Sequence, residues 1–239
     1  MQKVKDQTVV AAPCVRDRQA AAVKTAQAKS ARTDAKRGFY MVKRAVDLIG
    51  SAIGLIVLMP LLLAIMAVIK ISDPGSVIYK RVCMGKNGRQ FIMYKFRTMI
   101  ENAEEKTELF TSDTLMRHLA GDKTIDDPRI TKIGKHLRRT SLDELPQLYS
   151  VLRGEMSLVG PRPVVRREAD EYGENRDLLL SVKPGITGWW QVKGRKCCPY
   201  LSDEAKNLQL YYARHQSLRL DVQILLLTVK VLLLGRDSR

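Results

Sequence analysis

Apolar positions along the chain are concentrated in one long uncharged segment. Leu48–Ile69 contains 22 residues without a formal charge, and as a straight helix it would measure roughly 33 Å, enough to cross a bilayer. Pro60 lies near the middle, where a proline removes one backbone N–H and bends a helix. Basic residues flank both ends, and such flanks prefer the cytoplasmic side. Two interpretations stay open: a kinked single span, and a re-entrant helix that turns at Pro60 and leaves by the face it entered.

Three other stretches have readable patterns. Residues 77–100 alternate β-prone side chains around the turn residues 85–88, which predicts a strand pair. Residues 100–125 are polar and predict helix plus loop. Residues 218–234 are apolar with three charges, which predicts either an amphipathic helix in the membrane interface or a buried core helix. Asp47, at the start of the long segment, needs a partner, and Lys43 or Arg44 is in reach on the same helix face.

The charge balance narrows the range of partners. The net charge is +16, and residues 1–44 carry about half of it. A basic excess is typical of proteins that bind nucleic acid, an anionic membrane or an anionic substrate. Aromatic residues make up 6% of the chain, which argues against single-strand binding by base stacking. Residues 1–40 predict a basic, disordered tail that either contacts anionic lipids or acts as a solvated linker.

The candidate chemistry begins at an acidic pair in basic surroundings. Asp143 and Glu144 lie near four arginines along the chain, Arg138, Arg139, Arg153 and Arg162. One interpretation is structural, because Ser141 and Glu144 have the spacing of a capping box. The other is catalytic: nearby cations would keep Asp143 ionised, an ionised Asp can attack phosphorus, and Glu144 could hold Mg²⁺. Sequence alone does not decide between them.

Two basic side chains on the second predicted strand and one in a stiff turn could bind phosphate. Lys95 and Arg97 alternate to one face of a continued strand and would aim at a common point, although a solvated strand face has the same pattern. Arg162 lies between two prolines that fix the backbone, which suits bidentate phosphate binding. Gln191 and Arg195 stand beside two tryptophans in a turn-rich loop. Such a loop could recognise a base or a sugar, or could be a tight structural turn.

The order of these motifs resembles one known family. Tyr-Lys-Phe-Arg-Thr-Met, Ser-Leu-Asp-Glu-Leu-Pro-Gln, Val-Gly-Pro-Arg-Pro and Lys-Pro-Gly-Ile-Thr-Gly-Trp follow a Pro-broken apolar helix. Over residues 40 to 235 the chain resembles the bacterial sugar transferases, the monotopic polyprenyl-phosphate phosphoglycosyl transferases. The resemblance implies a re-entrant membrane helix. One departure is Met59 before Pro60, where many members have Ser, which leaves the kink angle open.

The resemblance implies a two-step reaction. Asp143 would attack the β-phosphate of a UDP-sugar, release UMP and form a phosphosugar–aspartate intermediate, which a polyprenyl phosphate then attacks. Glu144, together with Asp143, would hold Mg²⁺. By position, the other implied site residues are the cations expected to touch phosphates and the two residues of the nucleotide-sugar loop: Lys95, Arg97, Arg138, Arg139, Arg162, Gln191 and Arg195.

The resemblance also implies an organisation. We expect a helix-rich α/β fold with a basic tail (1–40), a re-entrant membrane helix (41–72), and a catalytic domain (73–235) with a small β-hairpin and amphipathic interfacial helices. This minimal catalytic form would face the cytoplasm on the inner membrane. Its expected partners are a UDP-sugar, polyprenyl (undecaprenyl) phosphate and anionic lipids, not nucleic acid, and a homodimer is compatible with the pattern. The reaction would begin exopolysaccharide, capsule, O-antigen or glycoprotein glycan assembly.

Two other functions compete with this interpretation. A membrane-attached nucleotide-sugar hydrolase would use the same covalent step with water as acceptor. A non-enzymatic basic adaptor would bind anionic membranes or nucleic acid in a salt-dependent manner, and Asp143 would be dispensable for it. Within the transferase interpretation, glucose, galactose and N-acetylated sugars all remain candidates, because their discrimination rests on a few hydrogen bonds.

Overall fold

The computed structural model describes residues 15–103, 106, 127–194 and 198–233, with side chains from residue 37 to residue 232. The chain divides into two compact units, Met1–Val42 and Lys43–Arg239. Most of the polar stretch 100–125 and the predicted site residue Arg195 lie outside the described residues. The basic tail expected over residues 1–40 stays a prediction, since the backbone is described only from Val15, where helix α1 begins.

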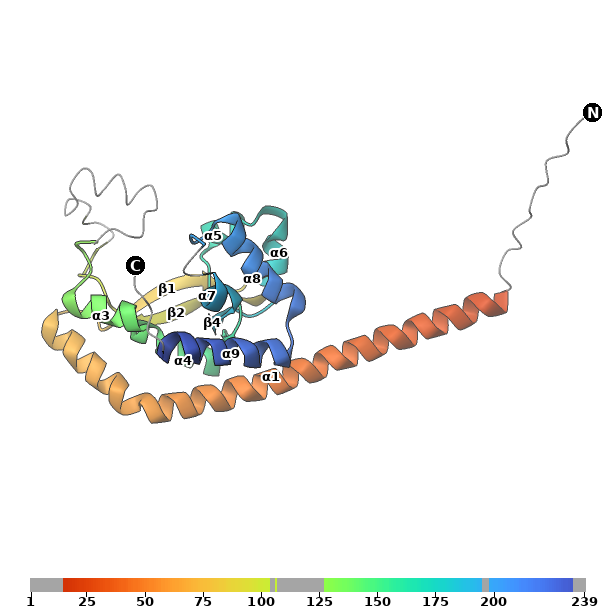
Figure 1. Cartoon of the computed structure of the whole chain (residues 1–239), viewed down its shortest axis with the longest axis horizontal. Helices are drawn as coiled ribbons and strands as arrows, with labels where there is room; N and C mark the ends of the chain where they lie inside the picture. Colours follow the sequence, from red (N-terminus) through yellow and green to blue (C-terminus); the bar gives the residue numbers. More distant parts are fainter. Residues whose placement is uncertain (1–14, 104–105, 107–126, 195–197, 234–239) are drawn as a thin grey trace, which may run out of the picture. The chain divides into compact units, whose positions relative to one another are not determined.

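Helix α1 (Val15–Ser72) contains the apolar segment and Pro60. Its part from Arg37 to Ser72 is long and apolar enough to cross a membrane, and only 17% of the most apolar stretch is buried. Figure 1 shows that α1 bends once, within its orange part. A bend is what a re-entrant helix requires, and the re-entrant path itself stays a prediction. Beyond Pro60, one helical face of α1 is buried against Phe96 and Leu137 through Leu62, Ile65 and Ile69.

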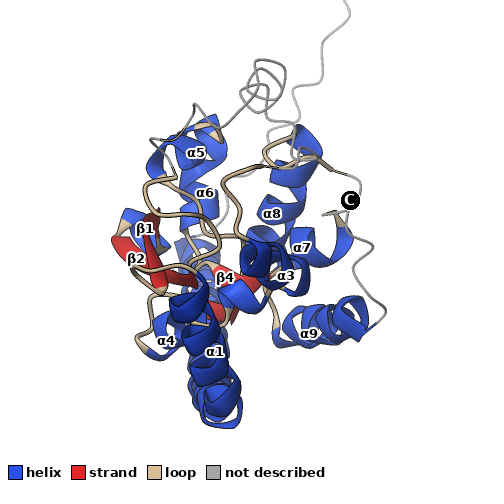
Figure 2. Ribbon diagram, turned by 90° about the vertical axis from the view of Figure 1, so that its left-hand side faces the viewer, coloured by secondary structure: helices blue, strands red, loops and turns tan. Residues whose placement is uncertain are grey.

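The predicted strand pair is confirmed. Strands β1 (Ile78–Met84) and β2 (Gln90–Phe96) are antiparallel, with Val82 opposite Ile92. The short helix η1 (Lys86–Gly88) forms the turn between them, and Asn87 and Gly88 both have positive φ there (58° and 74°). Asn and Gly tolerate this left-handed conformation better than other residues. Figure 2 shows β1 and β2 in red as a pair at one side of the helical body.

A second small sheet was not predicted. Strands β3 (Ser157–Val159) and β4 (Gly185–Thr187) pair in parallel. The backbones come very close just beyond β3, because a Cβ atom on Gly185 would lie 2.0 Å from the Gly160 backbone nitrogen. The expectation of a single strand pair is therefore corrected to two separate two-stranded sheets.

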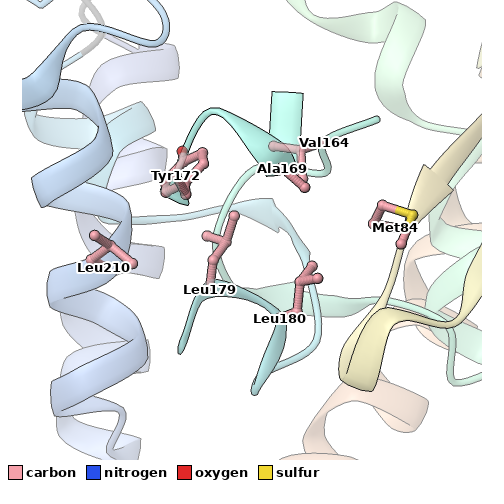
Figure 3. Packing of buried hydrophobic residues seen from close by; sticks show 7 residues of the cluster. All are labelled: Met84, Val164, Ala169, Tyr172, Leu179, Leu180 and Leu210. Atoms are coloured by element: carbon pink, nitrogen blue, oxygen red, sulfur yellow. The ribbon is translucent and has the colours of Figure 1, made fainter. Parts of the chain in front are cut away.

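The rest of the described chain is mostly helical, as expected for a helix-rich α/β fold. Besides α1, the helices are α3 (Lys132–Thr140), η3 (Leu142–Glu144), α4 (Gln147–Leu152), α5 (Arg166–Asp170), η4 (Gly173–Asn175), α6 (Arg176–Leu180), α7 (Trp189–Lys193), α8 (Asp203–His215) and α9 (Leu218–Leu233). Figure 3 shows the cluster that joins α5, α6 and α8 to the end of β1, formed by Met84, Val164, Ala169, Tyr172, Leu179, Leu180 and Leu210. This core fixes α5 beside the hairpin.

Helix α9 confirms the helix predicted near the C-terminus. One face is buried through Leu220, Asp221 and Ile224. The opposite face exposes large apolar side chains, Leu218, Val222, Leu226, Val229 and Leu232. The two alternatives therefore both describe part of the helix: one face packs in the core, and the other is apolar without a covering element among the described residues. Its location in a membrane interface stays a prediction.

The partner expected for Asp47 was wrong. Asp47 is buried, and its Oδ1 accepts hydrogen bonds from Ser157 Oγ and the Leu158 backbone N–H, both at 2.9 Å. Lys43 instead lies 2.7 Å from the Asp221 carboxylate on α9, and the Arg44 guanidinium donates to two backbone carbonyls at the end of α4. Tertiary packing overrides the local helix-face pairing because it offers these groups buried partners.

Candidate active site around the acidic pair

The acidic pair occupies a sharp connection between two helices. Helix α3 ends at Thr140, its C-cap Ser141 has the left-handed conformation (φ 59°), and η3 follows directly with Asp143 and Glu144. The Ser141 side chain makes no capping hydrogen bond, so the capping-box interpretation is wrong. Pro146 then begins the turn into α4. The left-handed residue redirects the chain, and this places both carboxylates beside strand β2 rather than along a helix start.

Lys95 is the cation nearest to both carboxylates. Its Nζ donates to Glu144 Oε1 at 2.8 Å and lies 4.0 Å from Asp143 Oδ2. The Arg162 guanidinium lies 3.7 Å from the same oxygen of Glu144. All four groups are at least partly buried, and Asp143 is only 9% exposed. The sequence-predicted Asp143, Glu144, Lys95 and Arg162 are therefore brought together, with two positive groups facing two negative ones.

Burial, more than charge, sets the protonation of Asp143. Burial raises the pKa of the Asp143 carboxyl above its ordinary value, and the neighbouring Glu144 carboxylate raises it further. Lys95 and Arg138 oppose this rise in the pKa of Asp143 without cancelling it. The cations were expected to dominate the pKa of Asp143, but desolvation has the larger effect and disfavours the charged form. A further positive charge placed beside this desolvated carboxylate would lower its pKa and stabilise its charged form.

Arg162 is held from two sides. Its backbone N–H donates to Gln209 Oε1 at 2.9 Å, and Gln209, which is almost fully buried, in turn donates to the Tyr172 hydroxyl. Its guanidinium lies 5.4 Å from the centre of the Tyr200 ring, within cation–π range. The stiff turn predicted from Pro161 and Pro163 therefore presents the Arg162 head at the acidic pair.

Lys95, Glu144 and Arg162 line a cavity of about 250 Å³, and Asp143, 4.0 Å from Lys95, is not among the lining residues. The cavity is bordered by side chains from both sheets and from helices α4, α5 and α7. Its lining residues are Arg81, Met93, Lys95, Glu144, Gln147, Arg162, Pro163, Glu168, Ile186, Gln191 and Tyr200. Polar and charged groups converge there on a few apolar ones, as ligand sites require. The predicted Gln191 lies in this lining.

Three predicted site residues lie elsewhere or are engaged differently. Arg97 is buried and donates to the backbone carbonyls of Asp73 and Pro74, in the loop after α1. The expectation that Lys95 and Arg97 aim at a common point is therefore not met, because Arg97 fastens that loop. Arg138 donates to Thr98 Oγ1 at 2.8 Å, and Arg139 is exposed on the last turn of α3.

Four polar residues of the cavity were missed by sequence reasoning. Gln147 is almost fully buried and belongs to the Leu-Pro-Gln end of the motif that holds the acidic pair, so the motif could have indicated it. Arg81, Glu168 and Tyr200 come from β1, α5 and the turn before α8. No local pattern marks these three, because only the tertiary fold brings them to one place.

The acidic pair fits a magnesium ion in part. Mg²⁺ is bound in proteins by one or two carboxylates together with waters and substrate phosphates, and Asp143 and Glu144 supply two adjacent carboxylates. Burial raises the pKa of Asp143, and a cation bound beside it would oppose this rise. No group of three or more His, Cys, Asp or Glu side chains able to hold a metal occurs in the described part of the chain. A magnesium ion here would therefore depend on the phosphates of a substrate for its remaining ligands.

Comparisons with known proteins agree with the motif order. Residues 39–235 match the family model of the bacterial sugar transferases. The chain is 42% identical over 201 residues to the exopolysaccharide production protein ExoY of Rhizobium meliloti, covering 83% of this chain and 88% of that protein. It is 42% identical over 202 residues to the undecaprenyl-phosphate galactose phosphotransferase of Salmonella typhimurium, covering 83% of this chain and 42% of the relative.

A third relative carries a different sugar in its name. The chain is 40% identical over 206 residues to the UDP-glucose:undecaprenyl-phosphate glucose-1-phosphate transferase of Xanthomonas campestris pv. campestris, covering 84% of this chain and 40% of that protein. The chain thus spans most of ExoY and less than half of the two longer relatives. The match over residues 39–235 includes the acidic pair and all the residues that line the cavity. The chain belongs to the bacterial sugar transferase family.

Proposed function

We propose that this protein transfers a sugar-1-phosphate from a UDP-sugar to a polyprenyl phosphate such as undecaprenyl phosphate, and so begins the assembly of a lipid-linked glycan. The observation that carries the proposal is the cluster of Lys95, Glu144 and Arg162 in the cavity lining, with Asp143 next to it, 4.0 Å from Lys95. The names of relatives that share 40–42% identity support the donor and acceptor classes.

Asp143 acts as the nucleophile. A carboxylate oxygen of Asp143 forms a bond to the β-phosphorus of the UDP-sugar, and the bond between that phosphorus and the oxygen bridging to the α-phosphate breaks, so that UMP leaves. A phosphate oxygen of the polyprenyl phosphate then attacks the same phosphorus. Asp143 leaves as a carboxylate, and the product is polyprenyl-diphospho-sugar. Each step exchanges one P–O bond for another, without an oxidant or reductant.

Lys95 and Arg162 stabilise the charge on the transferring phosphate. Lys95 lies between the two carboxylates, and Arg162 can reach a phosphate beside Glu144 with a planar, two-pronged donor. Glu144 orients both cations. A bound Mg²⁺, held by Glu144 and Asp143, would neutralise phosphate oxygens and lower the repulsion that an attacking carboxylate meets. The desolvated state of Asp143 suits this role, since a poorly solvated carboxylate is a stronger nucleophile once it is ionised.

The membrane is the source of the acceptor. Helix α1 exposes Ile49, Ile53, Ile56, Val57 and Leu63, and exposed apolar side chains on one helix are stable in lipid and not in water. We infer that α1 enters and leaves by the cytoplasmic face of the inner membrane, turning near Pro60. The apolar face of α9 then lies in the interface, and basic residues of the N-terminal part contact anionic lipids.

Release of UMP tests the proposal. Purified protein in a membrane mimic is given a panel of UDP-sugars with Mg²⁺, with and without polyprenyl phosphate. We expect UMP and lipid-linked sugar with at least one donor, and loss of both in Asp143→Asn. UMP release that is unchanged by the acceptor would identify a hydrolase instead. Absence of UMP with every donor would overturn the proposal and favour a non-enzymatic membrane protein.

A further inference from the structure

The cavity has a second polar end beyond the acidic pair. There, Arg81 of β1, Glu168 of α5 and Tyr200 lie together. The Tyr200 hydroxyl donates to Glu168 Oε2 at 3.0 Å, and Arg81 Nη2 lies 3.4 Å from Glu168 Oε1. A carboxylate at this end repels an anionic group. The proposed attack by Asp143 places the phosphates of a ligand at the Lys95 end, where Lys95 and Arg162 offset the two carboxylates, and this leaves a neutral polar group beside Glu168.

The two oxygens of Glu168 differ in their surroundings. Oε2 accepts from the Val165 backbone N–H and from Tyr200, both at 3.0 Å. Burial raises the pKa of the Tyr200 phenol, and the Glu168 carboxylate raises it further, so this hydroxyl keeps its proton and stays a donor. Oε1 has, among the described residues, only the long contact to Arg81, whose side chain is 43% exposed. Oε2 therefore fixes the side chain, and Oε1, which accepts only the long contact from Arg81 among the described residues, can accept a further hydrogen bond at the cavity that Glu168 lines.

A carboxylate oxygen next to a guanidinium suits hydroxyl groups. The carboxylate accepts a charge-assisted hydrogen bond from one hydroxyl, and the guanidinium donates to a neighbouring one. In a UDP-sugar, two parts offer such hydroxyls: the transferred sugar and the ribose. The sugar is bonded directly to the phosphate that Asp143 attacks, whereas the ribose is one phosphate further away.

The position of Arg162 favours the transferred sugar. Its guanidinium lies 3.7 Å from Glu144 and 5.4 Å from the Tyr200 ring centre, and Tyr200 bonds to Glu168. The second polar end is therefore one side chain away from the acidic pair, where the reacting phosphate belongs. The part of the UDP-sugar that fits between the acidic pair and Glu168 is the transferred sugar, because it is attached to the reacting phosphate.

We propose that Glu168 Oε1, supported by Arg81, binds a hydroxyl of the transferred sugar and so determines which UDP-sugars react. This inference rests on the proposed transferase function and assigns the part of the site that determines donor specificity. Glu168 is one carboxylate at one end of the cavity, so it can accept a hydrogen bond from one hydroxyl, or bind a vicinal pair together with Arg81. It does not contact the whole sugar.

Glu168→Gln tests this with little change in shape. The amide oxygen can still accept from Val165 and Tyr200, while an NH₂ group replaces the acceptor Oε1. The matched control is Glu171→Gln, an exposed carboxylate on the same segment outside the cavity lining. Each protein is given its best UDP-sugar and a set of single-deoxy analogues of it, and kcat/KM is measured for UMP release in the presence of polyprenyl phosphate. Thermal unfolding is recorded for every variant.

The proposal predicts coupling between Glu168 and one hydroxyl. In wild type and in Glu171→Gln, removal of that hydroxyl lowers kcat/KM by about 10- to 100-fold, the range of a hydrogen bond to a charged group. In Glu168→Gln, the parent donor is slowed by a similar factor and the deoxy analogue reacts as it does with wild type. Affinity for UMP, which has the ribose but no transferred sugar, stays within about twofold.

Other outcomes overturn the inference in different ways. A tenfold loss of UMP affinity in Glu168→Gln would place the ribose at this end of the cavity. Equal slowing of all donors in Glu168→Gln, together with lowered thermal stability, would show that Glu168 only caps α5. In that case Arg81→Gln, which removes an exposed side chain, would leave donor preference unchanged. If wild type is active but no removal of a sugar hydroxyl is coupled to Glu168→Gln, this inference is rejected and the proposed function stands. Absence of UMP from wild type with every donor would reject the proposed function itself.

Discussion

At the scale of single residues, Asp143 shows how burial and reactivity are linked. Its carboxyl is almost fully buried, and the loss of water raises its pKa although Lys95 is 4.0 Å away. The sequence indicated three charged neighbours of Asp143, namely Lys95, Arg138 and Glu144. It could not predict the sign of the pKa shift, because desolvation depends on the tertiary fold and exceeds the effect of the charges.

Replacing Asp143 by Asn is expected to stabilise the protein. A buried acid whose native pKa is raised binds its proton more tightly in the folded state, so stability falls as pH rises from about 3.8, the ordinary value, through the raised value. Above that window the full penalty is present, and Asp143→Asn removes it. The melting temperature at pH 7 in EDTA should therefore rise, by about 2–4 °C for each kcal/mol gained. Equal or lower stability of Asp143→Asn would contradict the desolvation argument.

Lys95 is expected to matter for rate more than for stability. Loss of one positioned cation at a reacting phosphate typically slows a reaction about 100- to 1,000-fold. We expect Lys95→Met to lower the rate of UMP release by this factor, and Lys80→Met, an exposed lysine on the neighbouring strand, to leave it within about twofold. A Lys95→Met protein with near-normal rate would remove Lys95 from the phosphate site.

At the scale of elements, the sequence predicts the structure that local patterns determine and misses the structure that long-range contacts determine. The β1–β2 hairpin was predictable because its strands are adjacent and its turn has Asn and Gly at positive φ. The β3–β4 sheet was not, because each strand has three residues and its partner comes from a distant part of the chain. Parallel pairs of this kind leave no periodic signal. Arg162 follows β3 by three residues and is held by Gln209 and Tyr200, so its residue type was visible in the sequence and its anchors were not.

Asp47 joins α1 to β3, and its replacement tests how strongly these two elements are held together. In Asp47→Ala, Ser157 Oγ and the Leu158 N–H lose their acceptor in a buried place. Each unsatisfied group costs about 1–3 kcal/mol. At about 2–4 °C for each kcal/mol, the two groups together should lower the melting temperature by about 4–24 °C. Asp47→Asn keeps an acceptor oxygen and should lose much less. Similar melting temperatures for the two variants would show that these hydrogen bonds do not hold β3 to α1.

At the scale of the whole molecule, a largely buried ionic cluster joins the part of α1 that begins at Lys43 to the rest of the second compact unit. Lys43 Nζ lies 2.7 Å from Asp221 Oδ2 and donates to the Val159 carbonyl at 3.0 Å, and the Tyr212 hydroxyl donates to Asp221 Oδ1 at 2.6 Å. Strand β3, helices α8 and α9 and the second compact unit's part of α1 thus share one polar centre. The depth of α1 in a membrane would therefore set the height of the cavity above it.

Breaking the Lys43–Asp221 pair from one side should cost more than removing both charges. Lys43→Met leaves Asp221 buried and uncompensated, which typically destabilises a protein by about 3–5 kcal/mol. Lys43→Met combined with Asp221→Leu should recover a large part of that loss. The measurement is thermal unfolding of both single variants and the double variant in one detergent. Strict additivity of the two single effects would show that the pair is not coupled.

The most direct test of the central claim is the mass of the intact protein after reaction with a UDP-sugar. Wild type and Asp143→Asn are incubated with a panel of UDP-sugars and Mg²⁺, without polyprenyl phosphate, and quenched rapidly. Covalent catalysis predicts a sugar-phosphate adduct on wild type only, located by fragmentation at Asp143, which disappears when polyprenyl phosphate is added. An adduct of equal yield on Asp143→Asn, or UMP release by wild type with no adduct at any quench time, would contradict Asp143 as the nucleophile.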